Sequence, residues 1–291
     1  MKKSIVTIGF FDGIHIGHAK LIETTVNTAK KEGLRSVLIT FDKKANKNKL
    51  LMTLAEKIEY LKTFGLDKIE MIPFTEVFAS IAPVVFYRKF LLNRFNMKKV
   101  VIGYDFMFGR NRSGNSLLLE KFCKPDNCRV IEIHPMKLDS KVVSSSAIKN
   151  CLLNGEIIKV SRMLGRNYSV YGEVKKGQGL GKTLGFPTAN LKIDPLKILP
   201  EGVFSGFVKF GRAYYPAVAN IGSNPTVSHD KSLKFEVHVI NCKKNAIIKE
   251  LRFFFVNKIR TEKKFRNLAE LRKQIARDVS FVLSSVKLPS S

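Results

Sequence analysis

The chain has 291 residues, 45% of them hydrophobic, and this length suits two globular domains better than one. Its formal net charge is +27, from 51 basic and 24 acidic residues, and the excess is spread over both halves of the chain. No apolar stretch reaches the roughly 18 residues of a membrane span, and no focused basic stripe or docking motif indicates a nucleic-acid partner.

The expected location follows from the first residues and the cysteines. The apolar run from Ser4 to Gly9 is too short for a signal peptide and is typical of a buried first strand. The four cysteines form no CxxC pair and lack a histidine at zinc spacing, which indicates free thiols in a reducing compartment. We expect a cytoplasmic monomer or weak oligomer, without membrane or specific nucleic-acid partners, whose even positive charge suits phosphate-rich ligands.

Strand-like and helix-like segments alternate through the first half. The expected strands are Ile5–Gly9, Ser36–Phe41, Ile69–Phe74, Lys99–Gly103 and Arg129–Ile133. The expected helices are Ala19–Lys31, Leu54–Phe64, Val84–Phe95, Ser116–Phe122 and Ala147–Asn154. Such alternation predicts an α/β, Rossmann-like domain with a parallel sheet covered on both faces. Ligands of such sheets bind beyond the carboxyl ends of the strands, so we expect a site after Ile8 and Ile102.

The second half has short β-rich runs separated by Gly, Pro and Asn turns. The expected strands are Tyr168–Val174, Val203–Phe210, Tyr215–Asn220, Lys234–Ile240 and Arg252–Val256. They predict an antiparallel β-barrel, with a sandwich as the alternative. A terminal helix packed on it is expected from apolar residues at helical spacing, namely Phe265, Leu268, Leu271, Ile275, Val279 and Val282. We place the domains at residues 1–162 and 163–291.

The segment from Gly9 to His18 joins the first expected strand to the first helix. Its glycines allow close backbone approach, and a helix N-terminus offers free N–H groups to phosphate. His15 and His18 straddle Gly17 and can stabilise charge on a nucleotide α-phosphate. The segment contributes these expected nucleotide-binding residues: Gly9, Phe11, Asp12, Gly13 and Gly17.

His15-Ile16-Gly17-His18 resembles the HxGH motif of a nucleotidyltransferase superfamily that includes class I aminoacyl-tRNA synthetases, although no KMSKS-like loop is found. A second signature of this superfamily is similar to the segment Val143–Lys149. The resemblance assigns four of its residues to the triphosphate: Ser144, Ser145, Ser146 and Lys149. Lys149 stands where arginine is usual, which keeps the charge and loses the bidentate fork.

The segment from Gly103 to Gly114 resembles the Gly-x-(Asp/Asn)-Phe-x-Phe-Gly segment of bacterial FAD synthetases. This resemblance implies a flavin site that involves Asp105, Phe108 and Arg110. Without it, the segment is a turn with a core-packed phenylalanine pair. The second expected strand departs from the family, because Lys43 and Lys44 follow Asp42 where Pro-His-Pro is usual.

The segment from Gly177 to Asn190 is rich in glycine and suits a loop that closes over phosphate. It is no P-loop, since residue 176 is lysine. Its end, Gly-Phe-Pro-Thr-Ala-Asn, closely resembles the signature of riboflavin kinases. The resemblance assigns six residues to the nucleotide: Gly179, Lys182, Gly185, Pro187, Thr188 and Asn190.

The riboflavin kinase resemblance also implies the chemistry. The Thr188 hydroxyl and the Asn190 amide are hard oxygen ligands for Mg²⁺ and place the ATP phosphates. Phosphorylation of the riboflavin 5′-hydroxyl needs a base, and the resemblance nominates Glu236. Glu236 alternates with its neighbours so that it shares a strand face with His238. Arg260 is expected at the flavin.

The order of these motifs resembles the bacterial bifunctional riboflavin kinase/FAD synthetase family along nearly the whole chain. The resemblance implies that the C-terminal domain phosphorylates riboflavin to FMN with ATP and Mg²⁺. It implies that the N-terminal domain adenylylates FMN to FAD and releases pyrophosphate. Two alternatives stay open: a riboflavin kinase whose N-terminal domain has lost adenylyl transfer, and a basic flavin- or RNA-binding protein without turnover.

Overall fold

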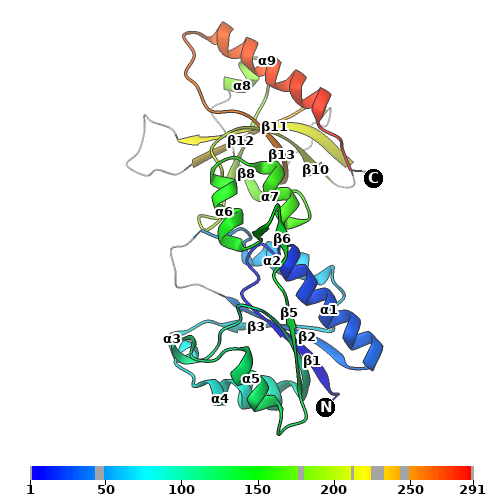
Figure 1. Ribbon diagram of the computed structural model, residues 1–291. Coiled ribbons are helices and arrows are strands. Elements are labelled where there is room, and N and C mark those ends of the chain that lie inside the picture. Colours follow the sequence, from blue (N-terminus) through cyan, green and yellow to red (C-terminus); the bar gives the residue numbers. More distant parts are fainter. Residues whose placement is uncertain are drawn as a thin grey trace. The chain divides into compact units, whose positions relative to one another are not determined.

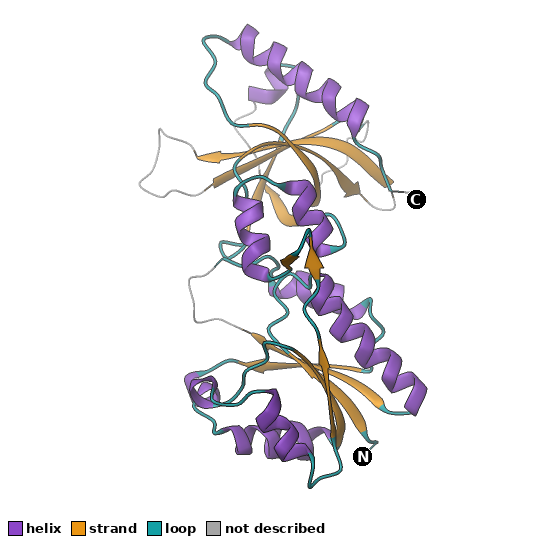
Figure 2. Ribbon diagram, viewed as in Figure 1, coloured by secondary structure: helices purple, strands orange, loops and turns teal. Residues whose placement is uncertain are grey.

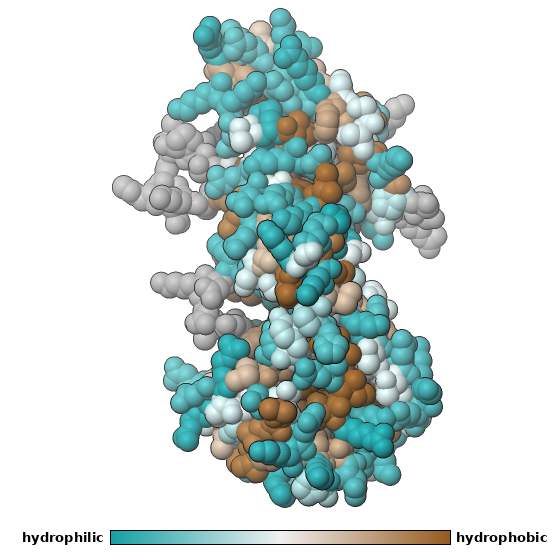
Figure 3. All heavy atoms as spheres, viewed as in Figure 1, coloured by the Kyte–Doolittle hydropathy of each residue, from teal (hydrophilic) through white to brown (hydrophobic). Residues whose placement is uncertain are grey.

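The chain divides into two units, Met1–Ser145 and Ser146–Ser291, which are described separately. The computed structural model describes residues 2–42, 49–175, 180–210, 213–223, 233–242 and 249–289 (Figure 1). The expected boundary after residue 162 stays a prediction. Hydrophilic side chains cover most of the face seen in Figure 3, in keeping with a chain of which 26% is charged. No helix of the described residues is long and apolar enough to cross a bilayer.

The first unit is built on five parallel strands in the order β3-β2-β1-β4-β5, which confirms the α/β prediction. The strands are β1 (Ser4–Ile8), β2 (Arg35–Asp42), β3 (Lys68–Pro73), β4 (Met97–Gly103) and β5 (Arg129–Ile133). The chain order reverses between β1 and β4. This is the topological switch point, the position at which ligands of such sheets bind.

Helices cover both faces of this sheet (Figure 2). Alternate strand residues serve the two faces: Ile5, Leu38 and Val101 pack with one set of helices, and their neighbours along the strands with the other. The helices with described bounds are α1 (Ile16–Glu32), α2 (Leu54–Lys62), α3 (Glu76–Ala79), α4 (Pro83–Val85) and α5 (Ser116–Cys123). A π-helix, η1 (Phe86–Asn93), continues α4 where an uninterrupted helix was expected.

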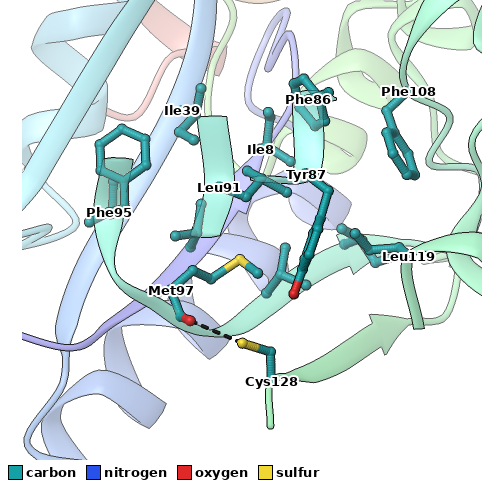
Figure 4. Close-up of a cluster of buried hydrophobic side chains, with 14 of the residues drawn as sticks. Ile8, Ile39, Phe86, Tyr87, Leu91, Phe95, Met97, Phe108, Leu119 and Cys128 are labelled. Carbon is teal, nitrogen blue, oxygen red and sulfur yellow. Dashed lines mark hydrogen bonds between the residues drawn. The ribbon is translucent and has the colours of Figure 1, made fainter. Parts of the chain in front are cut away.

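The π-helix face of the sheet carries a dense core (Figure 4). Phe86, Tyr87 and Leu91 point from η1 into this cluster and are almost fully buried. The Tyr87 hydroxyl donates to the carboxylate of Asp126 at 2.9 Å, so the buried phenol has a partner. This core holds β4 rigidly, and the loop that follows β4 contributes to the site.

A hairpin and a helix that the sequence did not predict lie on either side of α6 (Ser145–Leu153) in the chain, whereas α6 itself was expected over Ala147–Asn154. A two-strand hairpin, β6 (Lys137–Leu138) and β7 (Lys141–Val142), precedes α6. Helix α7 (Ile157–Leu164) follows and packs on strand β13 of the barrel. It ends at Gly165, whose φ of 70° is the left-handed conformation that favours glycine.

The second unit is a closed barrel of six antiparallel strands in the order β10-β11-β12-β9-β8-β13, which confirms the predicted barrel. The strands are β8 (Ser169–Lys175), β9 (Ala189–Ile193), β10 (Gly202–Phe210), β11 (Ala213–Ser223), β12 (Leu233–Val239) and β13 (Glu250–Arg260). A short helix, α8 (Leu180–Thr183), precedes β9. Strand β9 was not predicted, because its Gly-Phe-Pro-Thr-Ala-Asn entry is typical of a loop.

Aromatic side chains fill the barrel interior. Phe253 and Phe255 lie 4.9 Å apart between ring centroids, and Phe204 and Phe235 pack against them. Since these side chains are at most 1% exposed, the interior has no room for substrate, and a ligand must bind outside the barrel wall.

The terminal helix α9 (Leu268–Ser285) packs on the outer face of the barrel, as predicted. Val282 is fully buried against Val203 and Val218 of the wall. Leu268 differs from the expectation: it lies in the first turn, beyond the packed face, and is 55% exposed.

Candidate active sites

The loop after β1 has a strained backbone. Phe11 and Ile14 have φ values of 50° and 41°, which non-glycine residues rarely adopt, and both side chains are buried. Gly13 has φ 84°, and a Cβ there would lie 2.7 Å from Leu51. Such strain persists only where the surroundings over-determine it, which is common at functional sites.

His15 and His18 lie together at the start of α1. His15 is the N-cap, and its Nδ1 accepts from the His18 backbone N–H at 3.3 Å. The two rings stack with 3.7 Å between centroids. A Cβ at Gly17 would lie 3.2 Å from the His15 ring, so glycine allows this close arrangement. The first turn carries no acidic residue that would repel phosphate.

His18 is held in its neutral form. Burial lowers the pKa of His18 well below 6.5, and the neighbouring His15 and Lys57 lower the pKa further. Its Nδ1 is buried and makes no hydrogen bond within the described structure. A neutral imidazole next to phosphate can donate one hydrogen bond without taking a proton from solvent.

Asp12 and Ser145 fasten the loop to its neighbours. An Asp12 carboxylate oxygen accepts from the Leu51 backbone N–H at 2.9 Å. The Ser145 hydroxyl donates to the Asp12 carbonyl at 2.8 Å. Ser144 and Lys149 are half-buried and Ser146 is exposed. Of these four residues, Ser145 thus contacts the Gly9–His18 segment.

The segment after β4 forms a compact turn. Phe108 and Gly114 exchange two backbone hydrogen bonds, and a Cβ at Gly114 would strike the Phe108 ring. Phe108 packs on Phe86 and is only 5% exposed, so it supports the loop from within the core. Asp105 and Arg110, by contrast, are exposed and can reach a ligand.

A chain of aromatic contacts links this turn to the loop after β1. Phe108, Phe86, Phe78, Phe41 and Phe10 follow one another with ring centroids 5.0–6.0 Å apart. Phe10, the last residue of this chain of contacts, is 41% exposed. An exposed aromatic directly after β1 was a signal for ligand stacking that the sequence analysis did not use.

The second candidate site is a cavity of about 270 Å³ on the outer face of the barrel. Its wall comes from strands β9 to β12, and α9 and residues 260–265 cover it. Of the residues assigned from sequence, the cavity is lined by Thr188, Asn190, Glu236 and Arg260. Leu184, Phe186 and Phe265 give it an apolar side. A mostly apolar cavity with a few convergent polar groups is typical of a small-molecule site.

Three polar residues of this cavity form a row across the strands. Glu236 on β12 lies opposite Asn190 on β9 and opposite Asn220 on β11. Phe235 and Val237 point into the barrel, which leaves Glu236 and His238 on the outer face, as predicted. Asn220 was not assigned to the site, because pairing across strands cannot be read from local sequence.

His238 fixes the turn before β9. Its Nδ1 lies 2.8 Å from the Pro187 carbonyl oxygen, so Nδ1 carries the proton of this bond. Its ring meets Phe186 edge to face at 5.5 Å. A Cβ at Gly181 would lie 2.5 Å from the Phe186 carbonyl, so glycine allows the turn to close. Thr188 follows and is exposed toward the cavity.

Arg260 binds α9. Its Nε and NH2 groups donate to the carboxylate of Asp278 at 2.9–3.3 Å, and NH1 donates to the Thr261 carbonyl at 3.1 Å. Asp278 is nearly buried. The guanidinium fork therefore holds the helix over the cavity, a partner that the sequence did not predict.

The rest of the expected phosphate loop is described in part. Gly179 lies outside the described residues, and the Lys182 side chain is not described. Gly185 has φ 85°, the left-handed conformation, and both it and Pro187 are exposed. Lys43 and Lys44 also lie outside the described residues.

The oxygen donors of this cavity fit the magnesium ion that the sequence resemblance implies. No three His, Cys, Asp or Glu side chains of the described residues form a metal cluster. Oxygens of Thr188, Asn190 and Glu236 line the same cavity. Mg²⁺ commonly takes one or two protein oxygens and completes its shell with phosphates and water.

Known proteins resemble this chain along its whole length. A solved structure described as a macrolide-efflux protein from Streptococcus pneumoniae is 26% identical. It superposes with a TM-score of 0.89 over 98% of this chain and 95% of its own, which shows a shared fold.

Curated relatives and family models agree on both halves. The family model described as FAD synthetase matches residues 1–147, and the one described as riboflavin kinase matches residues 164–286. A bifunctional riboflavin kinase/FMN adenylyltransferase of Buchnera aphidicola subsp. Schizaphis graminum is 35% identical over 96% of this chain and 93% of its own. The protein of that name from Escherichia coli (strain K12) is 31% identical over 94% and 90%. The chain therefore belongs to the bifunctional riboflavin kinase/FMN adenylyltransferase family.

Proposed function

We propose that this chain makes FMN at the barrel and FAD at the crevice of the parallel sheet. The observation that carries the proposal is the row of Asn190, Glu236 and Asn220 in a cavity that also holds Thr188. Both family models and the bifunctional relatives support the two activities.

In the kinase reaction, the riboflavin 5′-hydroxyl attacks the γ-phosphate of ATP, and ADP leaves. Glu236 accepts the hydroxyl proton as the new O–P bond forms. Thr188 and Asn190 would hold a Mg²⁺ ion, which would neutralise charge on the transferring phosphoryl group. Leu184, Phe186 and Phe265 exclude water beside the reacting groups. Gly179 and Lys182 are proposed at the nucleotide from sequence alone.

In the adenylyltransferase reaction, the FMN phosphate attacks the α-phosphate of ATP and pyrophosphate leaves. The nucleophile is already ionised, so no base is required. His15 and His18 donate hydrogen bonds to the charge that grows on the α-phosphate, and the N-terminus of α1 adds backbone N–H groups. Ser144, Ser145, Ser146 and Lys149 are proposed at the ATP triphosphate from sequence alone, and Asp105 and Arg110 are proposed to contact the flavin.

One time course separates this proposal from its alternatives. Purified full-length protein with riboflavin, ATP and Mg²⁺ is followed by chromatography that resolves riboflavin, FMN and FAD. FMN should rise first and FAD should follow. FMN without FAD would select the kinase-only alternative, and flavin or RNA binding without ATP consumption would select a binding protein.

Two further properties are proposed from the sequence. A cytoplasmic location is supported by the four cysteines, all free in the structure. A monomer or weak oligomer without a nucleic-acid partner is supported by the even spread of positive charge.

A further inference from the structure

Lys57 on α2 is a lysine that the sequence analysis left unassigned, and it is only 8% exposed. Its ammonium donates to the carbonyls of Phe10 and Phe41 at 3.2 and 3.1 Å and to the Thr40 hydroxyl oxygen at 3.1 Å. Phe10 follows β1, and Thr40 and Phe41 end β2. One side chain therefore joins the carboxyl ends of two neighbouring strands beside the His15–His18 pair.

The hydrogen bonds show that this lysine is charged. The Thr40 hydroxyl donates its own proton to the Phe10 carbonyl at 3.3 Å, so Thr40 must accept from Lys57. All three partners of the amine are thus acceptors, and three N–H donors exist only in the ammonium form. Burial lowers the pKa of Lys57, and the neighbouring carboxylates of Asp12 and Asp42 raise it.

The same bonds exclude a direct contact with substrate. Three donors meet three acceptors, so the ammonium has no proton left for a phosphate. The residue after Phe10 is Phe11, whose ring meets the His18 ring at 5.2 Å. Lys57 can therefore act on the reaction only through the loop and through its charge.

We propose that Lys57 is a positioning residue for adenylyl transfer, which sets the loop after β1 and supplies a buried positive charge beside His18. The proposal rests on the proposed adenylyltransferase function. The titratable groups that face His18 are His15 from its own helix and Lys57 from α2. The positive charge of Lys57 disfavours an imidazolium at His18, so Lys57 helps to keep His18 a neutral donor after burial has already lowered its pKa.

The test compares Lys57→Met, which removes the charge, with Lys62→Met, which removes an exposed lysine of the same helix. Full-length protein with isotope-labelled histidines is titrated by NMR to obtain the His18 pKa. FAD formation from supplied FMN is measured across pH. In Lys57→Met the His18 pKa should rise and FAD formation should fall on the order of 10- to 100-fold, because the loop shifts. The acid limb of the pH profile, where FAD formation is lost, should begin at a higher pH in Lys57→Met than in the parent.

Lys57→Arg covers the case in which Lys57→Met does not fold. The charge remains, so the His18 titration should stay as in the parent, while a planar guanidinium misplaces the three acceptors and slows FAD formation. A raised His18 pKa in Lys57→Arg overturns the proposal. So does a Lys57→Met protein that titrates and turns over like Lys62→Met. FMN formation should be unchanged in all variants. A parent protein that makes no FAD defeats the proposed function instead, and the histidine titration still tests Lys57.

Discussion

Glu236 on β12 and Asn190 on β9 lie directly opposite each other in an antiparallel pair, and both side chains reach the cavity outside the barrel. Side chains of such directly paired residues begin about 5 Å apart. The base proposed at Glu236 and the magnesium ligand proposed at Asn190 would therefore serve one reacting region. An attacking hydroxyl and a metal-bound phosphate must meet at about 3 Å, and the strand pairing supplies that proximity.

Glu236→Gln should stop FMN formation and spare FAD formation. Glutamine keeps the size and hydrogen bonding of the side chain but cannot accept the hydroxyl proton. We expect the rate of FMN formation to fall by about 10²- to 10⁴-fold, as for loss of a general base. FAD formation from supplied FMN should be unchanged, because the residues proposed for that reaction, His15 and His18, lie in the other unit. Both are measured by chromatography of the flavins.

The matched control is Glu201→Gln, since Glu201 is an exposed glutamate just before β10. This variant should form FMN at the parent rate. If Glu236→Gln also keeps the parent rate, Glu236 is not the base.

Asn190→Ala should raise the Mg²⁺ and ATP requirement of the kinase. The variant removes one proposed oxygen ligand and leaves Thr188 and Glu236 in the cavity. Loss of one bond to a charged group costs about 1.5–3 kcal/mol, which is about 10- to 150-fold in apparent affinity. Initial rates of FMN formation over a Mg²⁺ series measure this effect. Since Leu191 and Ala189 still pair with β12, the strand should persist, and an unchanged Mg²⁺ series would remove Asn190 from the metal site.

The local patterns of this chain predicted its architecture well and its tertiary partners poorly. Apolar alternation located the sheet strands and most barrel strands, because burial of one face requires it. It missed β9, because Gly185 and Pro187 just before it indicate a loop and only pairing with β8 and β12 makes a strand. Barrel closure, a long-range effect, decides that segment.

The same limit applies to individual side chains. Phe108 was expected at the flavin, and it lies 5% exposed in the core, since the Phe108–Gly114 bridge turns it inward. From sequence, a lysine such as Lys57 in an amphipathic helix is expected to face solvent. Its burial is explained only by its three hydrogen-bond partners, two backbone carbonyls and one hydroxyl. The Arg260–Asp278 pair joins a strand to a helix, and no local spacing predicts such a contact.

Asp278→Asn should loosen α9 from the barrel and weaken riboflavin binding. The carboxylate accepts from Arg260 and also from Gln274 at 2.8 Å, so an amide leaves buried donors without acceptors. We expect a loss of about 1–3 kcal/mol in the unfolding free energy of the barrel and a higher KM for riboflavin. Thermal unfolding and FMN kinetics measure the two effects.

Glu270→Gln is the control on the same helix, because its oxygen that accepts from the Arg266 N–H survives as an amide oxygen. Its stability and KM should match the parent. FAD formation from FMN should be unaffected in both variants, and a parent-like KM in Asp278→Asn would show that α9 does not shape the flavin site.

The stability of the first unit should fall with acid because of His18. Burial, then His15 and Lys57, lower the pKa of His18 in the folded state below its ordinary 6.5. Between the two pKa values, His18 is protonated in the unfolded chain and neutral in the folded chain. This contribution to stability is therefore complete above about pH 6.5 and is lost as pH falls toward the folded pKa. The loss approaches about 1.4 kcal/mol per pH unit.

Hydrogen exchange of the β1 and β4 amides at pH 7.5 and 5.5 measures this loss of stability for the first unit alone. His18→Gln should remove most of the pH dependence, while His134→Gln, at an exposed position, should keep it. Equal slopes in the parent and in His18→Gln would mean that His18 is protonated as readily in the folded chain as in the unfolded one, and its role as a neutral donor to the α-phosphate would fail with it.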